Sequence, residues 1–543
     1  MNDYPSIFND AIGPVMRGPS SSHCAAALRI GRLARDLMGG NLRHVVVEFD
    51  PAGSLATTHT TQGSDMGLCG GLLGWEATDE RLVSSVQAIA EAGIEVAFRI
   101  TEIGATHPNT YKLTLTDVHE THTMTALSTG GGMIEVIEID GAPVSMRGDA
   151  YETLLFVRDD PTRLAQALAA QTEADAPRTA DAPQTADAPR TADAIVTHEG
   201  SEGGFVQVKV QRVLPEGLLA RLRAAFEILQ VRTLSPVLPV LSGGYLRVPF
   251  VTCEEMTAYN ADKGLALWEL ACHYEGARGN LSQDQVLRRM QETVRIMQAA
   301  VRQGMAGTGY EDRILGRQSD GFQSALAGGQ LLDGGMLNRM ILYVTALMEV
   351  KSAMGVFVAA PTAGACGGLP GACLGAVDAL GLGIEEAARA MLAAGLIGVF
   401  IAARATFAAE VAGCQAECGA GSAMAAAALV TLAHGTVEQA LAAASMALQN
   451  VLGLICDPVA NRVEVPCLGR NVMAASNALA CANMALAGYD AVVPLDEVIE
   501  TMLRVGESLP SSLRCTALGG LSVTPTSKAI QARLGGSPCG PLS

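Results

Sequence analysis

Three cysteines in the second half of the chain have a spacing that suits an iron–sulfur centre. Cys456 and Cys467 stand eleven positions apart in the stretch CDPVANRVEVPCLGRN, and Cys414 lies forty-two positions before Cys456. Structural zinc sites usually pair their ligands about two to four residues apart, and an iron–sulfur electron carrier needs a fourth thiolate. Three widely spaced thiolates instead suit a [4Fe–4S] cluster whose open iron acts as a Lewis acid on a substrate hydroxyl and carboxylate.

Prolines constrain the backbone around these cysteines. Asp457-Pro458 and Val465-Pro466 favour extended or turning backbone, so we expect a shaped loop or hairpin between helices. For most of the other cysteines we expect the role of a small buried hydrophobic residue. These are Cys24, Cys69, Cys253, Cys272, Cys366, Cys373, Cys418, Cys481 and Cys515.

Two motifs have the composition of an anion site for a substrate carboxylate. Residues 18–23 read GPSSSH and open a helix predicted over residues 25–38, so three hydroxyls and the helix dipole would attract an anion. An ordinary serine N-cap explains this motif equally well. In residues 361–364, successive backbone N–H groups can point at one ligand. The candidates for carboxylate binding are Ser20, Ser21, Ser22, Thr362, Ala363, Gly364 and Arg470.

Histidine titrates near neutral pH and is a natural candidate for acid–base work. His23 closes the GPSSSH motif and His107 begins HPN, and both lie in Gly-, Pro- or Ser-rich segments of the kind that line sites. A structural hydrogen-bonding role explains each of them equally well. Asn109, Asn471 and Ser128 (in the STGGG segment) are candidates for orienting a substrate, although either asparagine could cap a turn.

The composition limits the classes of partner. The chain of 543 residues has a net charge of −18 and a pI near 5.0, which disfavours nucleic acid and anionic membrane surfaces. Aromatic residues make up only 4%, and 59 glycines suggest closely packed helices. No signal peptide is apparent, and thirteen scattered cysteines do not resemble a secreted disulfide framework, so we expect a cytoplasmic protein. Three uncharged windows within residues 351–378, 417–438 and 438–457 are expected to be buried helices of a soluble domain.

The chain divides into three expected domains and a tail. Residues 1–148 alternate predicted strands and helices, and residues 149–240 predict a small βαββαβ module of ACT type. Inside that module, residues 174–191 form a tandem hexapeptide without an apolar face, which we interpret as a disordered loop expansion. Residues 245–530 predict a helical domain, with single helices expected over residues 254–274 and 385–412 among others, and residues 531–543 form a tail. The fold class is therefore an α+β N-terminal domain, an ACT-like α/β module and a large all-α C-terminal domain.

Taken together, the motifs GPSSSH, HPN, STGGG, APTAG..G.LPG, AE.AGCQ and CDPVANRVEVPCLGRN resemble the iron–sulfur-dependent L-serine dehydratases over nearly the whole chain. The resemblance implies a β part followed by an α part in one chain. It maps the ligands of a [4Fe–4S] cluster to Cys414, Cys456 and Cys467 and implies conversion of L-serine to pyruvate and ammonia. Some members cap the open iron with a tail cysteine, for which Cys539 is the candidate here. We also expect a homodimer.

One departure from the family pattern puts the substrate in doubt. Residues 61–65 read TQGSD where the family usually has Gly-His-Gly-Thr-Asp, so Gln62 replaces a histidine and cannot titrate near neutral pH. His59 is the candidate replacement in acid–base work. Threonine or a related β-hydroxy acid is an alternative substrate. The sequence also admits a pyridoxal-phosphate dehydratase that uses Lys351, or a non-catalytic protein that binds a small molecule.

Overall fold

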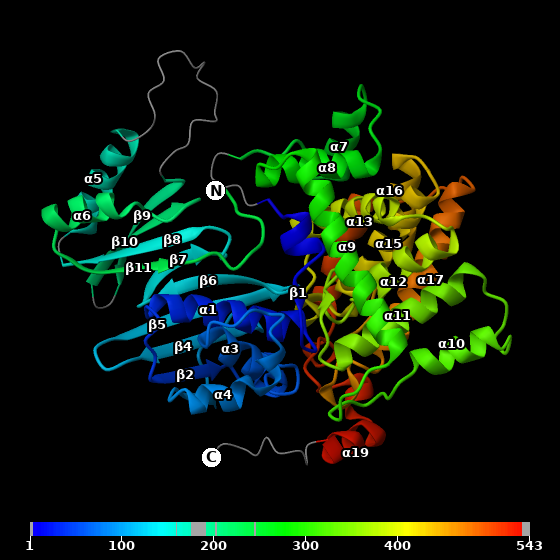
Figure 1. Ribbon diagram of the computed structural model, residues 1–543, viewed down its shortest axis with the longest axis horizontal. Coiled ribbons are helices and arrows are strands. Elements are labelled where there is room, and N and C mark those ends of the chain that lie inside the picture. The colour runs from blue at the N-terminus through cyan, green and yellow to red at the C-terminus, as the bar shows by residue number, and fades with distance from the viewer. Residues whose placement is uncertain (1–3, 159, 175–191, 201–202, 244–245, 535–543) are drawn as a thin grey trace.

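The computed structural model describes residues 4–158, 160–174, 192–200, 203–243 and 246–534, so Cys539 and repeat residues 175–191 lie outside the described residues. Two lobes lie side by side, one containing the sheets and one almost entirely helical (Figure 1). The six-stranded and four-stranded sheets come from the first part of the chain, and most of the helical lobe comes from the rest. The predicted change from an α/β region to a helical region is therefore confirmed.

A six-stranded sheet forms the centre of the N-terminal region in the described residues, in the order β3–β2–β4–β5–β6–β7. Alternate residues of β4 and β5 are buried, as expected for a sheet with one covered face. Only β2 and β3 are parallel. The elements are β2 (His44–Phe49), β3 (Glu95–Ile100), β4 (Thr110–Thr116), β5 (Thr121–Gly130), β6 (Met133–Ile139), β7 (Ala142–Met146), α1 (Ala26–Leu37), α2 (Leu55–Thr58), α3 (Ser64–Leu72) and α4 (Ser85–Glu91).

The small module has the predicted βαββαβ order. Its four described strands lie in the antiparallel order β11–β8–β10–β9, and its helices pack apolar residues such as Leu164 and Leu222 against that sheet. The assignment of this module to the ACT-type fold stays a prediction. The elements are β8 (Tyr151–Val157), α5 (Pro161–Ala174), β9 (Ala194–Gly200), β10 (Gly203–Val210), α6 (Glu216–Ala225) and β11 (Ile228–Leu234).

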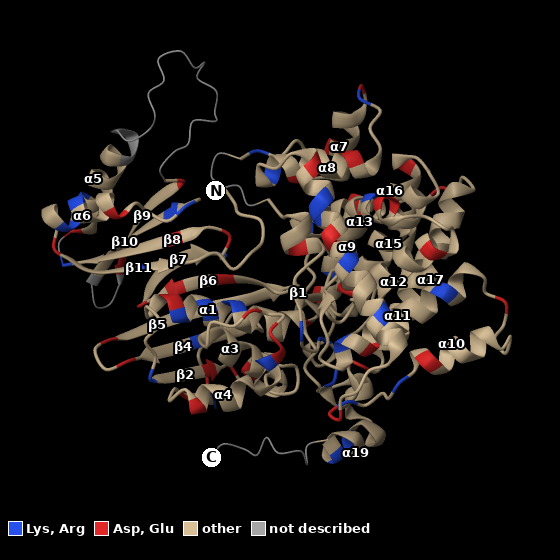
Figure 2. Ribbon diagram, in the orientation of Figure 1, with Lys and Arg blue, Asp and Glu red and all other residues tan. Residues whose placement is uncertain are grey.

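The helical lobe is built around α15, a helix of small apolar residues without a charged side chain, whereas charged residues lie mainly on the outer helices (Figure 2). Small side chains allow the neighbouring helices to pack closely around it. The helices are α7 (Cys253–Asn260), α8 (Leu267–Gly279), α9 (Gln283–Ala306), α10 (Ser319–Ala327), α11 (Met336–Ser352), α12 (Gly368–Ala379), α13 (Ile384–Arg404), α14 (Ala409–Ala412), α15 (Cys418–Leu432), α16 (Val437–Gln449), α17 (Cys467–Leu486), α18 (Leu495–Ser508) and α19 (Pro525–Leu534).

Two helices predicted as continuous are each divided in the structure. The predicted helix over residues 254–274 breaks between α7 and α8, where the Asn260 side chain binds the backbone N–H and C=O of Leu265 and so stabilises a turn. The predicted helix over residues 385–412 breaks after α13, where the Thr406 hydroxyl accepts a hydrogen bond from Ala408 N. Both predictions of a single helix were wrong because local side-chain-to-backbone bonds compete with the helix.

The first described residues belong to the helical lobe, which differs from the predicted 1–148 domain. Ile7 and Ile12 are buried in its main apolar core. Ser6 Oγ and Ile7 N both donate to the buried carboxylate of Glu275, at 2.5 and 2.8 Å. The strand β1 (Val15–Met16) then pairs with β12 (Phe357–Val358) of the helical lobe. The chain therefore crosses the helical lobe before it enters the first sheet.

One helix in the described residues, α13, is long and apolar enough by composition to cross a membrane, and 78% of its most apolar window is buried inside the protein. The uncharged windows singled out in the sequence contribute α12, α15 and α16, which belong to the same buried core. These helices therefore form the core of the folded lobe, as predicted.

Candidate active site

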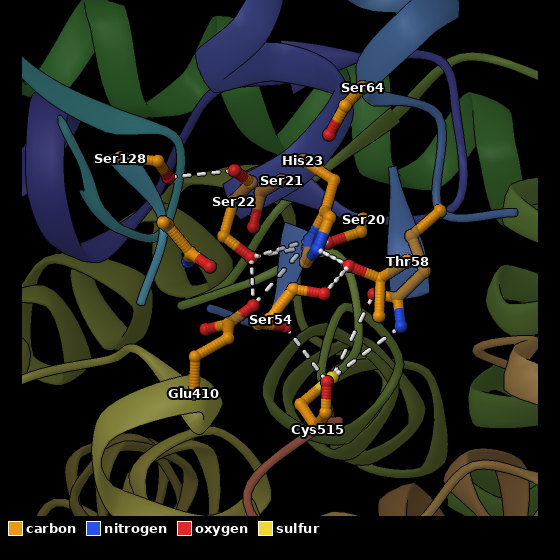
Figure 3. A network of polar contacts seen from close by, with 12 residues as sticks. Ser20, Ser21, Ser22, His23, Ser54, Thr58, Ser64, Ser128, Glu410 and Cys515 are labelled. Atoms are coloured by element: carbon orange, nitrogen blue, oxygen red, sulfur yellow. Dashed lines mark hydrogen bonds and ion pairs between the residues drawn. The ribbon is translucent and has the colours of Figure 1, made fainter. Parts of the chain in front are cut away.

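The GPSSSH motif lies where the two lobes meet (Figure 3). Ser20 precedes a short π-helical turn, Ser21–Ala25, which continues directly into α1. The hydroxyls of Ser20 and Ser22 lie 3.0 and 3.2 Å from His23 Nδ1, and all of these residues are buried. The motif therefore presents hydroxyl groups, an imidazole and a helix N-terminus to the other lobe.

The hydrogen bonds around His23 define its tautomer. Thr58 Oγ1 donates to the carbonyl of Ser54, so its contact of 2.7 Å with His23 Nε2 requires that Nε2 carry the proton. The lone pair is then on Nδ1, where the Ser20 hydroxyl donates. Burial lowers the pKa of His23, which keeps the imidazole neutral. His23 Nδ1 is thus a buried proton acceptor that faces the helical lobe.

The helical lobe contributes a carboxylate to this network. Glu410, on the short helix α14, accepts a hydrogen bond of 2.7 Å from the Ser22 hydroxyl through Oε1, which also lies 3.5 Å from His23 Nδ1 (Figure 3). The Glu410 side chain is only 2% exposed. Residues 388 positions apart in the chain therefore share one polar network.

A second arm of the network comes from the sheet. The backbone N–H of Asn109 donates to His107 Nδ1 at 3.1 Å, so the proton of neutral His107 is on Nε2, and burial lowers the pKa of this imidazole. Ser128 N donates to the Asn109 carbonyl, and Ser128 Oγ donates to the Ser22 carbonyl at 2.7 Å. The structure thus brings together the predicted residues of the GPSSSH, HPN and STGGG motifs.

The STGGG turn between β5 and β6 brings the sheet against α14. A Cβ atom on Gly130 would lie 2.7 Å from Ala408 N, and Gly130 has φ +110°. Glycine meets both the steric and the conformational demand. This close approach places the end of β5 beside the helix that carries Glu410.

The turn at residues 361–364 lies against the GPSSSH motif, and its role in anion binding stays a prediction. The N–H of Ala363 donates to Ser21 Oγ at 3.1 Å, so this donor already has a protein partner. The Thr362 hydroxyl donates to Glu417 Oε1 at 2.6 Å, and a Cβ on Gly364 would lie 2.8 Å from the same oxygen. Burial raises the pKa of Glu417 to about 8, so its carboxyl group is protonated at neutral pH. The amide of Asn471 likewise binds protein groups with both of its atoms.

The three predicted cysteine ligands are buried on neighbouring segments of the helical lobe. Cys414 begins a short turn after α14, Cys456 lies in the loop after α16, and Cys467 begins α17. Their exposed fractions are 2%, 6% and 7%. Cys418 lies within hydrogen-bonding reach of Cys414, and Cys515 within reach of Cys456. Cys418 and Cys515 are buried as expected, but they lie beside the predicted ligands and not in a remote core.

The surroundings of these thiols fit an anionic cluster. Arg470 contacts Cys414 and forms an ion pair of 2.7 Å with Asp457. Lys351, which is 0% exposed, donates to the Val463 carbonyl and offsets part of the burial that raises the pKa of the Cys467 thiol. Buried cations stabilise thiolates. Within the described ranges, no three His, Cys, Asp or Glu side chains lie close enough together to bind a single metal ion. The ligands of an iron–sulfur cluster bind different irons and therefore lie further apart than the ligands of a single ion.

Gln62, the residue at the family's histidine position, lies between the lobes. Its Nε2 donates to Asn461 Oδ1 at 2.9 Å and to Cys515 Sγ at 3.5 Å. His59 does not occupy this position: its Nδ1 lies 2.6 Å from Asp65 Oδ1, and its ring packs against Phe98. The geometry therefore gives no support to His59 as the replacement acid–base group.

Several residues of the site were not singled out in the sequence. Glu410 and Glu417 flank Cys414 in the AE.AGCQAE segment, which was the only signal for either of them. Thr58, Ser54 and Cys515 had no distinguishing signal, because each acquires its role from a partner in another motif or in the other lobe. Figure 3 shows Ser54 and Thr58 near His23, with a dashed line from Ser54 to Cys515, whose carbonyl accepts from the Ser54 hydroxyl.

Comparison with known proteins identifies the family. A family model described as "Serine dehydratase alpha chain" matches residues 262–522. The chain is 36% identical over 291 residues to the "Probable L-serine dehydratase, alpha chain" of Bacillus subtilis (strain 168), covering 54% of this chain and 97% of that protein. It is 41% identical over 157 residues to the "Probable L-serine dehydratase, beta chain" of the same organism, covering 29% and 70%.

A third relative also matches. The chain is 35% identical over 287 residues to "L-serine dehydratase 1" of Escherichia coli (strain K12), covering 51% of this chain and 62% of that protein. Sequence related to an alpha chain and to a beta chain is thus joined in one polypeptide. The chain belongs to the L-serine dehydratase family and is therefore a lyase.

Proposed function

We propose that this protein converts L-serine to pyruvate and ammonia by β-elimination at a [4Fe–4S] cluster held by Cys414, Cys456 and Cys467. The observation that carries this proposal is the polar network at the contact between the two lobes. There, the Ser–His–Glu network around His23 ends on Glu410, four residues before Cys414. When bound, the cluster supplies a Lewis acid for the leaving hydroxyl group. The remaining roles fall to the residues of this chain.

Removal of the α-proton needs a neutral base near the junction. His23 Nδ1 has a lone pair, and its opposite nitrogen is fixed as a donor by Thr58. We assign His23 as the base and His107, whose Nε2 carries a proton, as a donor to the substrate. The N-terminus of the helix that begins at Ser21 stabilises the substrate carboxylate. Loss of water from L-serine gives 2-aminoacrylate, whose imine tautomer hydrolyses to pyruvate and ammonia.

The test is anaerobic purification followed by iron and sulfide analysis and a substrate panel. We expect about four iron and four sulfide per chain, and release of pyruvate and ammonia from L-serine. Active protein that lacks iron would overturn the cluster assignment.

A second candidate is elimination from threonine or a related β-hydroxy acid, and the observation that favours it is Gln62. The Gln62 amide contacts Cys515, which lies beside the predicted ligand Cys456. The lining of the site next to this ligand therefore differs from the family pattern. Comparing kcat/KM for L-serine and L-threonine on one preparation distinguishes the two. A higher value for L-threonine would establish the second candidate.

A further inference from the structure

One oxygen of the buried Glu410 carboxylate lacks a hydrogen-bond partner in the described part of the chain. Oε1 accepts the Ser22 hydroxyl, whereas Oε2 is fully buried without a partner. Removing a carboxylate from water costs several kcal/mol unless a donor or a cation compensates. The neighbouring imidazole of His23 cannot supply the charge, because it is neutral. Oε2 therefore has the chemistry of a site for a cationic donor.

Asn109 provides a second and independent observation. Its side chain is 0% exposed, and neither Oδ1 nor Nδ2 has a partner among the described residues. Flipping the amide, which exchanges the positions of its oxygen and nitrogen, does not supply hydrogen-bond partners, because neither position has one. A fully buried amide without partners is rare in folded proteins and points to a bound polar group.

The two side chains belong to one network. Asn109 is linked through its backbone carbonyl to Ser128 N, and the Ser128 hydroxyl binds the carbonyl of Ser22, whose own hydroxyl binds Glu410. Figure 3 shows Ser128, Ser22 and Glu410 next to one another. The junction thus offers an unpaired carboxylate oxygen and an unpaired amide on residues of one hydrogen-bonded network.

We propose that Glu410 binds the α-ammonium group of the substrate through Oε2 and that Asn109 Nδ2 donates to its carboxylate. This proposal rests on the proposed function and narrows it, because it makes an amino group a requirement for binding. A hydroxy acid without an ammonium group would leave the Glu410 carboxylate buried and uncompensated. Glu410 is thus the residue that selects amino acids over hydroxy acids of the same shape.

The experiment measures binding of L-alanine and of L-lactate, in which a hydroxyl replaces the ammonium, by calorimetry on anaerobic protein; neither has a β-hydroxyl group to lose, so neither is consumed. Wild type should bind L-alanine at least about 30-fold more tightly than L-lactate, as expected for a desolvated charge pair. Glu410→Gln should weaken L-alanine binding by a similar factor and change L-lactate binding less than about threefold. Glu410→Asp, which keeps the charge, should retain part of the preference.

The matched control is Glu152→Gln. Glu152 is also buried with one oxygen that lacks a hydrogen bond, but it lies on β8 in the small module. This variant should bind both ligands as wild type does. Iron content and thermal unfolding show whether each variant is folded. The preference of wild type for the amino acid over the hydroxy acid tests the proposal without any variant.

Two results would overturn the proposal: wild type binding L-lactate as tightly as L-alanine, or Glu410→Gln weakening the binding of both ligands equally. Failure of the proposed function is a separate result, namely wild type that releases no pyruvate from L-serine. The preference for an ammonium-bearing ligand is measured by binding alone and does not depend on that turnover.

Discussion

Asn471 accepts a hydrogen bond of 2.7 Å from the backbone N–H of Gly368, which lies 103 positions earlier in the chain. The same side chain donates to the Gly364 carbonyl and to the Cys467 carbonyl, both at 2.8 Å. The first turn of α17 is therefore fastened to the turn at residues 361–364 and to the start of α12. This geometry makes Asn471 a residue that positions the cysteine-bearing helix.

We expect Asn471→Asp to destabilise the fold strongly while leaving the shape of the side chain unchanged. Aspartate keeps the acceptor for Gly368 but replaces the donor with an oxygen, which removes the hydrogen bonds to the carbonyls of Gly364 and Cys467 and places an oxygen against both. The cost should be on the order of 3 kcal/mol in the free energy of unfolding, measured by urea denaturation. Asn338→Asp is the control, because the Asn338 amide on α11 makes a solvent-exposed hydrogen bond with the Leu332 carbonyl. A shift no larger than that of the control would show that the Asn471 donor is dispensable.

Replacing any one of Cys414, Cys456 and Cys467 with serine should abolish the cluster. A serine oxygen is a hard ligand and holds iron–sulfur iron poorly. Iron and sulfide analysis and the broad absorbance near roughly 400 nm measure the loss. Cys373→Ser, a buried thiol on α12 outside the cysteine group, should keep both. Full iron content in any one of the three variants would remove that residue from the ligand set.

His23→Ala should retain iron but lower kcat by on the order of 100-fold, since a general base contributes about that much or more. Steady-state kinetics on protein of known iron content measures the effect. His44→Ala is the control, because this histidine lies at an exposed position at the start of β2. An unchanged kcat would leave His23 with a purely structural role in the network of Ser20 and Thr58.

Local motifs predicted the parts of the site that are contiguous in the chain. Ser22 and His23 are neighbours in the GPSSSH segment and share one turn at the start of a helix. The local sequence was therefore sufficient to predict both as site residues. Glu410 could not be nominated in this way, because its role comes from a partner 388 positions away. The element order of the small module followed from periodicity. The path of residues 4–16 did not, because those residues bury their apolar side chains in a core whose helices come much later in the chain.

The stability of the protein should depend on pH through Asp10, whose pKa burial raises to about 6 from 3.8. The folded state holds this proton more tightly, so the contribution to stability is complete below pH 3.8 and is lost as the pH rises through 6. Asp10→Asn removes the titration and should be more stable than wild type by on the order of 3 kcal/mol at pH 7.5, with the difference shrinking at pH 5.

The measurement is thermal unfolding of both proteins from pH 5 to pH 8. Asp333→Asn, at an exposed position before α11, controls for the general loss of a negative charge. A constant difference between Asp10→Asn and wild type across this range would contradict the assignment.

Gly130→Ala should disturb the contact between the lobes, in addition to straining the backbone at residue 130. Its methyl group would meet Ala408 N at 2.7 Å and push β5 away from the segment that leads into α14. Because Glu410 is on α14, we expect KM for L-serine to rise by about tenfold or more, in keeping with the cost of a misplaced binding group. Gly93→Ala is a matched control, since Gly93 also has a positive φ (+78°) but has open space around its Cβ position. The control should lose stability without a change in KM, and an equal rise of KM in both variants would show that the contact with Ala408 does not position Glu410.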